Sequence, residues 1–450
     1  MLAELSALVR SGQIDPVDLV KESIRRIENA SNINAVVALY AEEAIAEAKS
    51  HSRTGALAGL PLLVKDMARV KGHVTTSGSR LYADGSPDEL DDTVVHQLRS
   101  EGAIVLGRTN SPEFGATAYT DNLLFGPTRN PWNNDKSPGG SSGGSAAALA
   151  AGLAPLATTS DGGGSVRGPA AAVGLVGYKP SMGAIGRNIL PRWIDFSTQG
   201  STAATVADVV YQAAITHVPA QGDFLSLPSN AVSLVPRMPK RILVCRTFRS
   251  DVDPDVEANF ESTIDALAAS GLTIERVEAP TDNDTIWNWF VMSTAQLTQS
   301  LRHEEHRWHE LSEYVQGQLK FGSTVTIDQY IAAQRKRHEV SARFDALLGD
   351  DAVLLCPTAN ARSWPAEGPL PSFAGNTEDP MVTLNTPDAN FTGHPATSAP
   401  MGLDDNGVPC GLHITGPRFL DDLTLGLAAH LERIQPWAHV APGYSPFSLS

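Results

Sequence analysis

The sequence has little positive charge. Its 450 residues include 34 lysines and arginines against 50 acidic residues, which gives a formal net charge of -16, and the basic residues form no run. Nucleic acids and anionic membrane surfaces need clustered positive charge. We therefore expect no nucleic-acid partner and no membrane partner, which leaves small neutral or cationic substrates open.

Cysteines and long apolar segments are also scarce. The three cysteines, Cys245, Cys356 and Cys410, stand singly in apolar contexts, as is typical of a reducing compartment. Glu4 lies where a signal peptide would have basic residues. No apolar run reaches the roughly 18 residues of a membrane span. These features predict a cytoplasmic protein.

What the chain does have is an alternation of helical and strand-like segments. Helices are expected at 15–28, 91–102 and 255–271, and strands at 103–110, 241–247, 272–280 and 352–358. The apolar run at 62–64 is expected to end a further, buried strand. Such an order predicts an α/β fold with a large mixed, mostly parallel β-sheet covered by helices on both faces. We expect one domain over residues 1–450, with a helical insertion or cover at about 285–348.

Residues 139–168 hold two clusters of glycine and serine around one alanine-rich stretch. They match neither a phosphate-binding loop nor a dinucleotide fingerprint. Residues 139–143 match G-x-S-x-G, but a turn-rich loop precedes them where a nucleophile elbow needs a strand. Loops that cap one helix, at 145–154, would explain an isolated cluster. Two clusters that both contain serine favour a site built from backbone N–H groups.

A serine nucleophile needs a base, and histidine is the usual one. No histidine lies between His96 and His217, and the stretch from His303 to His309 misses a zinc motif because Arg307 occupies the second ligand position. Lys65 follows a buried apolar run, and burial favours the neutral form of lysine. Lys65 is thus either a base or a lysine that extends to solvent from a strand end.

At this point the chain resembles the amidase signature family. The resemblance rests on residues 139–183, on "LPLLVKD" at 60–66, and on "NFTGHPATSAPMG" and "GVPCGLHITGP" near the C-terminus, so that it covers nearly the whole chain. It implies a catalytic core at 60–200 in which Ser165 is the nucleophile, Ser141 is a bridging serine after a cis peptide bond, and Lys65 is the base.

The resemblance also implies the chemistry. A proton relay from Ser165 through Ser141 to Lys65 would cleave linear carboxamides through an acyl-enzyme and release a carboxylic acid and ammonia or an amine. It needs neither a metal nor an organic cofactor. The N–H groups of Gly162, Gly163, Gly164 and Ser165 are expected to form an oxyanion hole.

Three further residues are expected to support the site. Ser142 should form a hydrogen bond within it, and Asp161 should pair with Arg167 to hold the nucleophile loop. Ordinary loop structure explains all three equally well.

The chain departs from the family pattern at framework positions. Gly162 replaces the usual threonine, which predicts a more flexible loop, and Ser201, Ala204 and His413 replace the usual proline, arginine and glutamine. Gly168 stands where transamidase subunits usually carry glutamine. This last difference weighs against the first alternative, the amidase subunit of a tRNA-dependent amidotransferase.

A second alternative is a nitrilase-type amidase with Cys356 as its nucleophile, but a small buried side chain in a strand is the simpler interpretation of that cysteine. Trp193, Trp287 and Trp289 are expected near the acyl pocket and suggest apolar or aromatic acyl groups, although core packing would explain them equally well. The expected partner is a small-molecule amide. Because members of the family are often dimers, a homodimer stays open.

Overall fold

The strands form two sheets. The computed structural model describes residues 1–249, 251–371 and 383–449. Its smaller sheet has the order β1-β3-β2-β4 and the larger β5-β7-β6-β11-β12-β10-β8-β9. The strands are β1 (Val36–Leu39), β2 (Pro61–Lys65), β3 (Ile104–Thr109), β4 (Leu156–Ala157), β5 (Thr159–Asp161), β6 (Val176–Lys179), β7 (Thr198–Ala203), β8 (Arg241–Val244), β9 (Ile274–Arg276), β10 (Ala352–Pro357), β11 (Ala396–Leu403) and β12 (Pro409–Thr415).

The larger sheet is mixed, as predicted, but the expectation that it is mostly parallel is wrong. In it only the pairs β10–β8 and β8–β9 are parallel. The pairs β5–β7, β6–β7, β6–β11, β11–β12 and β10–β12 are antiparallel. Parallel neighbours need a crossover connection that is usually a helix, whereas β6 reaches β7, and β11 reaches β12, through loops alone.

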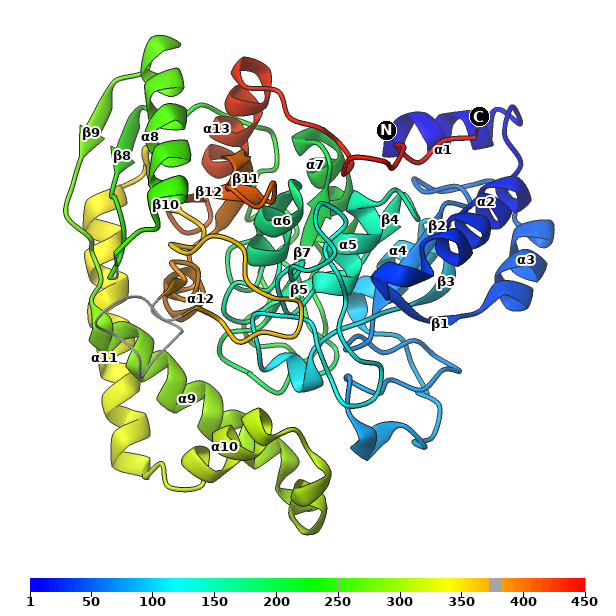
Figure 1. Ribbon diagram of the computed structural model, residues 1–450, viewed down its shortest axis with the longest axis horizontal. Coiled ribbons are helices and arrows are strands. Elements are labelled where there is room, and N and C mark those ends of the chain that lie inside the picture. Colours follow the sequence, from blue (N-terminus) through cyan, green and yellow to red (C-terminus); the bar gives the residue numbers. More distant parts are fainter. Residues whose placement is uncertain (250, 372–382, 450) are drawn as a thin grey trace.

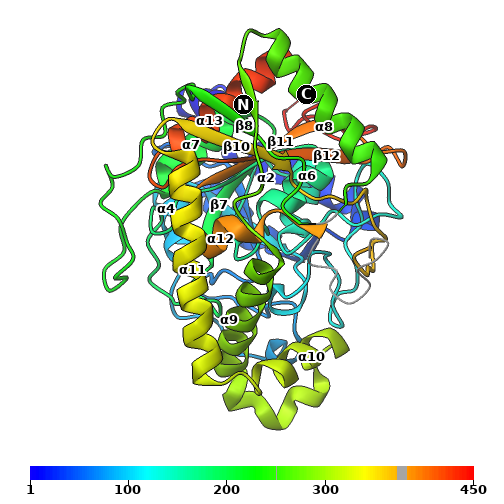
Figure 2. The same ribbon diagram turned by 90° about the vertical axis from the view of Figure 1, so that its left-hand side faces the viewer.

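Helices cover both faces of the larger sheet (Figures 1 and 2). Side chains alternate along its central strands, so that Ile242 and Val353 join one apolar cluster while Leu243 and Leu354 join another. The first cluster includes residues of α7 (Val206–Thr216), α8 (Pro254–Ala269) and α13 (Asp421–Ile434). The second includes residues of α9 (Asn283–Leu301), α11 (Ile327–Leu348) and α12 (Pro387–Thr392).

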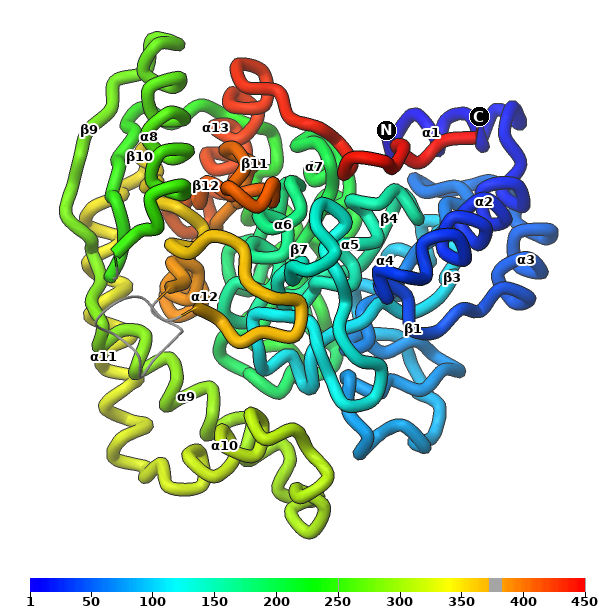
Figure 3. The backbone as a smooth tube through the Cα atoms, viewed as in Figure 1, coloured from blue at the N-terminus to red at the C-terminus, as the bar shows by residue number. Residues whose placement is uncertain are grey.

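The smaller sheet has its own helices. These are α1 (Leu2–Arg10), α2 (Pro16–Asn29), α3 (Ala41–Ser50), α4 (Thr93–Ser100) and α5 (Gly143–Ala150). The helices predicted at 15–28 and 91–102 are confirmed as α2 and α4, and the side chain of Asp15 caps α2 by accepting the Val17 N–H. The C-terminal segment returns to α1, where Phe447 and Leu5 share one apolar cluster (Figure 3).

The segment predicted as a helical insertion is helical. It contains α9, the 3-10 helix η4 (Arg302–Glu310), α10 (Glu313–Gly322) and α11, which extend away from the sheets in both ribbon views (Figures 1 and 2). His303, His306 and His309 are exposed on η4. In the part of the chain that the structure describes, no group of three or more histidine, cysteine or acidic residues could hold a metal ion. No helix there has the length and apolarity needed to cross a membrane.

Candidate active site

The predicted site residues lie at the ends of neighbouring elements. Lys65 is the last residue of β2, Ser142 directly precedes α5, and Asp161 ends β5. Ser165 lies two residues before α6 (Arg167–Val173). The peptide bond between Gly140 and Ser141 is cis, as the family resemblance implies.

The side chain of Lys65 ends among serine hydroxyls. Its Nζ lies 2.8 Å from Oγ of Ser141, 2.9 Å from Oγ of Ser142 and 3.0 Å from Oγ of Ser160. Lys65 is 1% exposed, and this burial lowers its pKa to about 7 although the charge of Asp161 acts in the opposite direction. A substantial fraction of Lys65 is therefore neutral near pH 7 and able to accept a proton. Sequence analysis missed Ser160, because a serine between two other polar residues of a short strand carries no signal of its own.

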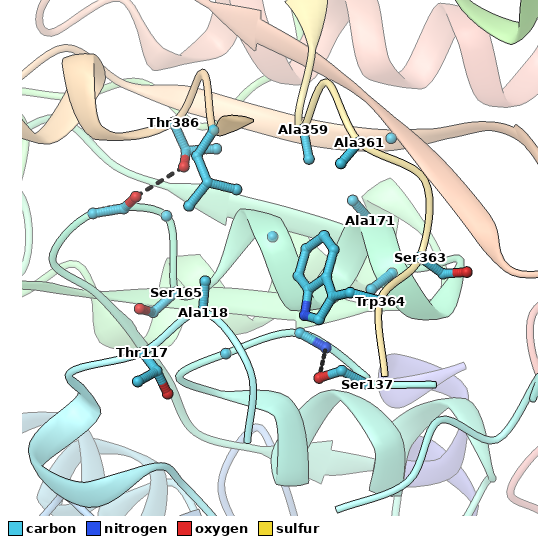
Figure 4. A pocket seen from close by; sticks show the side chains of 18 of the residues that line it. Thr117, Ala118, Ser137, Ser165, Ala171, Ala359, Ala361, Ser363, Trp364 and Thr386 are labelled. Carbon is cyan, nitrogen blue, oxygen red and sulfur yellow. Dashed lines mark hydrogen bonds between the residues drawn. The ribbon is translucent and has the colours of Figure 1, made fainter. Parts of the chain in front are cut away.

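Ser165 is buried apart from an exposed fraction of 9%. Its side chain lies at the wall of a cavity (Figure 4). Its backbone carbonyl accepts the Ser142 N–H at 3.3 Å, which joins the two glycine-rich loops. Among the described residues its hydroxyl has no hydrogen-bond partner, so the structure joins Lys65 directly to Ser141 but not Ser141 to Ser165.

The glycines before Ser165 differ in what their N–H groups contact. The N–H of Gly164 donates to Asp161 Oδ1 at 2.6 Å, so the expectation that it helps to form an oxyanion hole is wrong. The N–H groups of Gly162, Gly163 and Ser165 have no hydrogen-bond partner among the described residues. Three donors thus remain free for a substrate oxygen.

Neighbouring side chains fix the peptide planes of this loop. Trp289 Nε1 donates to the carbonyl of Gly162 at 3.1 Å, and Thr386 Oγ1 donates to that of Gly163 at 2.8 Å. Gly164 has a φ of +127°, and a Cβ there would collide with the Thr386 side chain, so that this position requires glycine.

The indole of Trp193 accounts for glycine at position 162. A Cβ on Gly162 would lie 2.5 Å from the Trp193 ring, so Trp193 leaves no room for the usual threonine there. The packing also restrains the loop that the sequence had predicted to be more flexible.

Asp161 and Arg167 form a bidentate ion pair with no exposed surface. Arg167 Nη2 lies 2.9 Å from Asp161 Oδ1, and Nε lies 3.0 Å from Oδ2. Burial alone would raise the pKa of Asp161, but the Arg167 guanidinium holds it well below its ordinary value. Arg167 also donates to Asn390 Oδ1 at 2.6 Å, a partner that sequence analysis missed. The pair therefore fixes the nucleophile loop against α12.

Two cavities meet at Ser165. One, of about 70 Å³, is lined by glycines, alanines, Trp193, Trp289 and Trp364, and none of the described residues that line it is charged. Figure 4 shows Trp364 and Ser165 at its wall. The other is a polar groove of about 670 Å³ whose lining includes Lys65 and Ser141. The expectation for Trp287 is wrong, because it is 49% exposed and its ring lies against Phe290 and Phe321, away from both cavities.

Cys356 lies inside β10 and lines neither cavity. Burial raises the pKa of its thiol well above the ordinary value, and its Sγ lies 3.7 Å from Nδ1 of His413. A protonated, enclosed thiol is a poor nucleophile. These contacts agree with a small buried side chain in a strand.

Known proteins resemble the chain over nearly its full length. The profile of the Amidase family matches residues 18–425. An acylamidase of Rhodococcus erythropolis is 32% identical, over 98% of this chain and 97% of its own. One component of the glutamyl-tRNA(Gln) amidotransferase of Deinococcus radiodurans is 31% identical, over 96% of each chain.

Solved structures agree with these sequence relatives. A bacterial aryl acylamidase of the amidase signature family has a TM-score of 0.88 and 29% identity, and the match covers 97% of this chain and 96% of that one. A 6-aminohexanoate cyclic dimer hydrolase complexed with substrate has the same TM-score, 27% identity and 98% coverage of both chains.

Proposed function

We propose that this chain, which belongs to the amidase signature family, is a free-standing amidohydrolase that acts through an acyl-enzyme on Ser165. One observation carries this proposal. Lys65 Nζ lies 2.8 Å from Ser141 Oγ in a buried site that lowers the lysine pKa to about 7. A base with that pKa is half deprotonated near neutral pH, where a general base works best.

The proposed reaction begins with a proton relay. Neutral Lys65 accepts the proton of Ser141, Ser141 accepts that of Ser165, and Oγ of Ser165 attacks the carbonyl carbon of the amide. The N–H groups of Gly162, Gly163 and Ser165 stabilise the negative charge that develops on the carbonyl oxygen. Returning the proton through Ser141 to the amide nitrogen expels the amine. Water then uses the same relay to release the carboxylic acid.

The lining of the smaller cavity supports a neutral, apolar acyl group. Its tryptophans and alanines offer apolar contact, and none of its described lining residues has a charged side chain to bind the α-amino and α-carboxylate groups of glutamine. This favours a free-standing enzyme over the amidase subunit of an amidotransferase. Glutamine should accordingly be a poor substrate compared with an apolar acyl amide, and efficient glutamine hydrolysis would favour the amidotransferase instead.

A fluorophosphonate probe tests the nucleophile. We expect mass spectrometry of the digested protein to find the label on Ser165, and Ser165→Ala to abolish both labelling and amide hydrolysis. Cys356→Ala is the matched control and should retain both. Label on Ser141 or Cys356 with Ser165 unmodified would contradict the proposal.

A further inference from the structure

The polar groove beside Ser165 contains one arginine without an acidic partner. Of the three arginines that line it, Arg69 lies 3.6 Å from Asp88, and Arg187 lies 3.1 Å from Asp223. For Arg192, no carboxylate lies within ion-pair distance among the described residues. Within the described residues, the groove therefore holds one arginine that forms no ion pair.

The contacts of Arg192 fix the position of its side chain but include no negatively charged group. Its guanidinium carbon lies 4.8 Å from the centre of the Phe114 ring and 5.6 Å from that of Tyr82, and Nη1 donates to Ser77 Oγ at 3.2 Å. All three partners are uncharged. A guanidinium has five N–H donors in a planar fork that suits a carboxylate, and it stays protonated at neutral pH. Arg192 is thus positioned in advance for an anion.

The acidic residues of the groove are already engaged. Asp88 accepts a hydrogen bond from Thr75 Oγ1 and also lies 3.8 Å from the guanidinium of Arg108. Asp92 accepts the backbone N–H of Arg69, and burial raises its pKa to about 6. Neither carboxylate competes for Arg192.

Neighbours of Arg192 pack against both the loop that contains Gly162 and the loop that contains Ser141. The next residue, Trp193, lies against Gly162, where a Cβ would approach its ring to 2.5 Å. The guanidinium of Arg192 lies over the ring of Phe114. The residue after Phe114 is Gly115, and a Cβ there would lie 3.1 Å from Ser141 Oγ. Arg192 thus belongs to the same packed region as these loops and lines the same groove as Ser141 and Ser165.

The position of the proton donor indicates which part of the substrate lies in the groove. The departing nitrogen takes its proton from Ser141, and both Ser141 and Lys65 line the polar groove and not the apolar cavity. The amine portion therefore occupies the groove, while the acyl group occupies the apolar cavity. This step rests on the proposed function.

We propose that Arg192 binds a carboxylate on the amine portion of the substrate, so that N-acylated amino acids with an apolar acyl group are preferred substrates. The net charge of -16 does not oppose this, because charges more than about 8 Å away are largely screened at physiological salt. A local arginine then determines how well the anion binds.

Two substrates that differ only in this charge provide the test. N-hexanoylglycine carries a carboxylate where N-hexanoylpropylamine carries an uncharged ethyl group, and the hexanoic acid released from each is quantified. For the parent we expect kcat/KM to be about 10-fold or more higher for the glycine derivative, as a charged hydrogen-bonded contact implies. Arg192→Gln should lower that value by about 10- to 100-fold and change kcat/KM for the propylamine derivative by less than about twofold.

Arg69→Gln is the matched control, because Arg69 lines the same groove but has an acidic partner. It should keep most of the preference for the glycine derivative. If the parent has the same kcat/KM for the propylamine derivative and the glycine derivative, the assignment of Arg192 is wrong, and no variant is needed to show it. The proposed amidohydrolase function would be unaffected by that result. An equal loss on both substrates in Arg192→Gln would indicate a merely structural arginine. If the parent hydrolyses neither substrate and Ser165 is not labelled, the proposed function itself fails.

Discussion

Burial of Lys65 should lower the free energy of unfolding at the pH where Lys65 serves as a base. The unfolded chain binds the lysine proton below its ordinary pKa of 10.5, whereas the folded protein binds it only below about 7. Between these values the unfolded state holds more protons, so the free energy of unfolding rises with pH. The penalty is fully present below about pH 7 and disappears above about pH 10.5.

The magnitude follows from the pKa difference. At 1.36 kcal/mol per pKa unit, the penalty is about 4 kcal/mol at pH 7 and about 1 kcal/mol at pH 10. Lys65→Met removes it, but also removes the hydrogen bonds to Ser141, Ser142 and Ser160, worth about 1 kcal/mol each. The inactive variant should therefore be more stable than the parent by about 1 kcal/mol at pH 7 and less stable by about 2 kcal/mol at pH 10.

Urea unfolding of the parent and Lys65→Met at pH 7, 8, 9 and 10, followed by tryptophan fluorescence, measures this reversal. Lys320→Met, at an exposed position of α10, is the matched control and should differ from the parent by the same amount at every pH. A pH-independent difference for Lys65→Met would refute the reasoning, because it would show that Lys65 is equally protonated in the folded and unfolded chains.

Three further outcomes are expected. Asp161→Asn leaves Arg167 buried without its carboxylate, and urea unfolding should show a loss of about 3–5 kcal/mol; an unchanged midpoint would contradict the role assigned to the pair. Lys65→Arg should lower kcat/KM by about 100- to 10,000-fold, because a guanidinium does not release its proton, and near-parental activity would remove Lys65 from the relay. EDTA should leave the rate unchanged, whereas loss of activity that zinc restores would revive the histidines at 303–309.

Local patterns were sufficient to predict many elements but not how the strands pair. The helix at 255–271 and the strand at 352–358 are confirmed as α8 and β10, because apolar spacing and caps act within one segment. The direction of β11 and β12 depends on a short connection between two segments, so alternation along the chain could not reveal it. The predicted helix at 145–154 begins earlier, at Gly143, inside the first glycine cluster.

The site residues also divide into those that local motifs predict and those that depend on distant partners. Lys65, Ser141 and Ser165 lie in motifs that carry the family resemblance. Asn390 and Arg192 act through partners far away in the sequence, so no local spacing marks them. The error at Gly164 has a similar cause, because three consecutive glycines look alike until the position of the Asp161 carboxylate is known.

His413 shows why a departure from the family pattern leaves the nucleophile loop intact. Its Nε2 lies 2.7 Å from Arg167 Nη1, and burial holds its pKa well below the ordinary value, so the ring is neutral. A neutral imidazole has one ring nitrogen that accepts a hydrogen bond. His413 therefore accepts the Arg167 N–H, which is what the carbonyl oxygen of the usual glutamine can do. The substitution preserves the hydrogen bonding of Arg167, and through Arg167 the position of Asp161 and of the loop that carries Ser165.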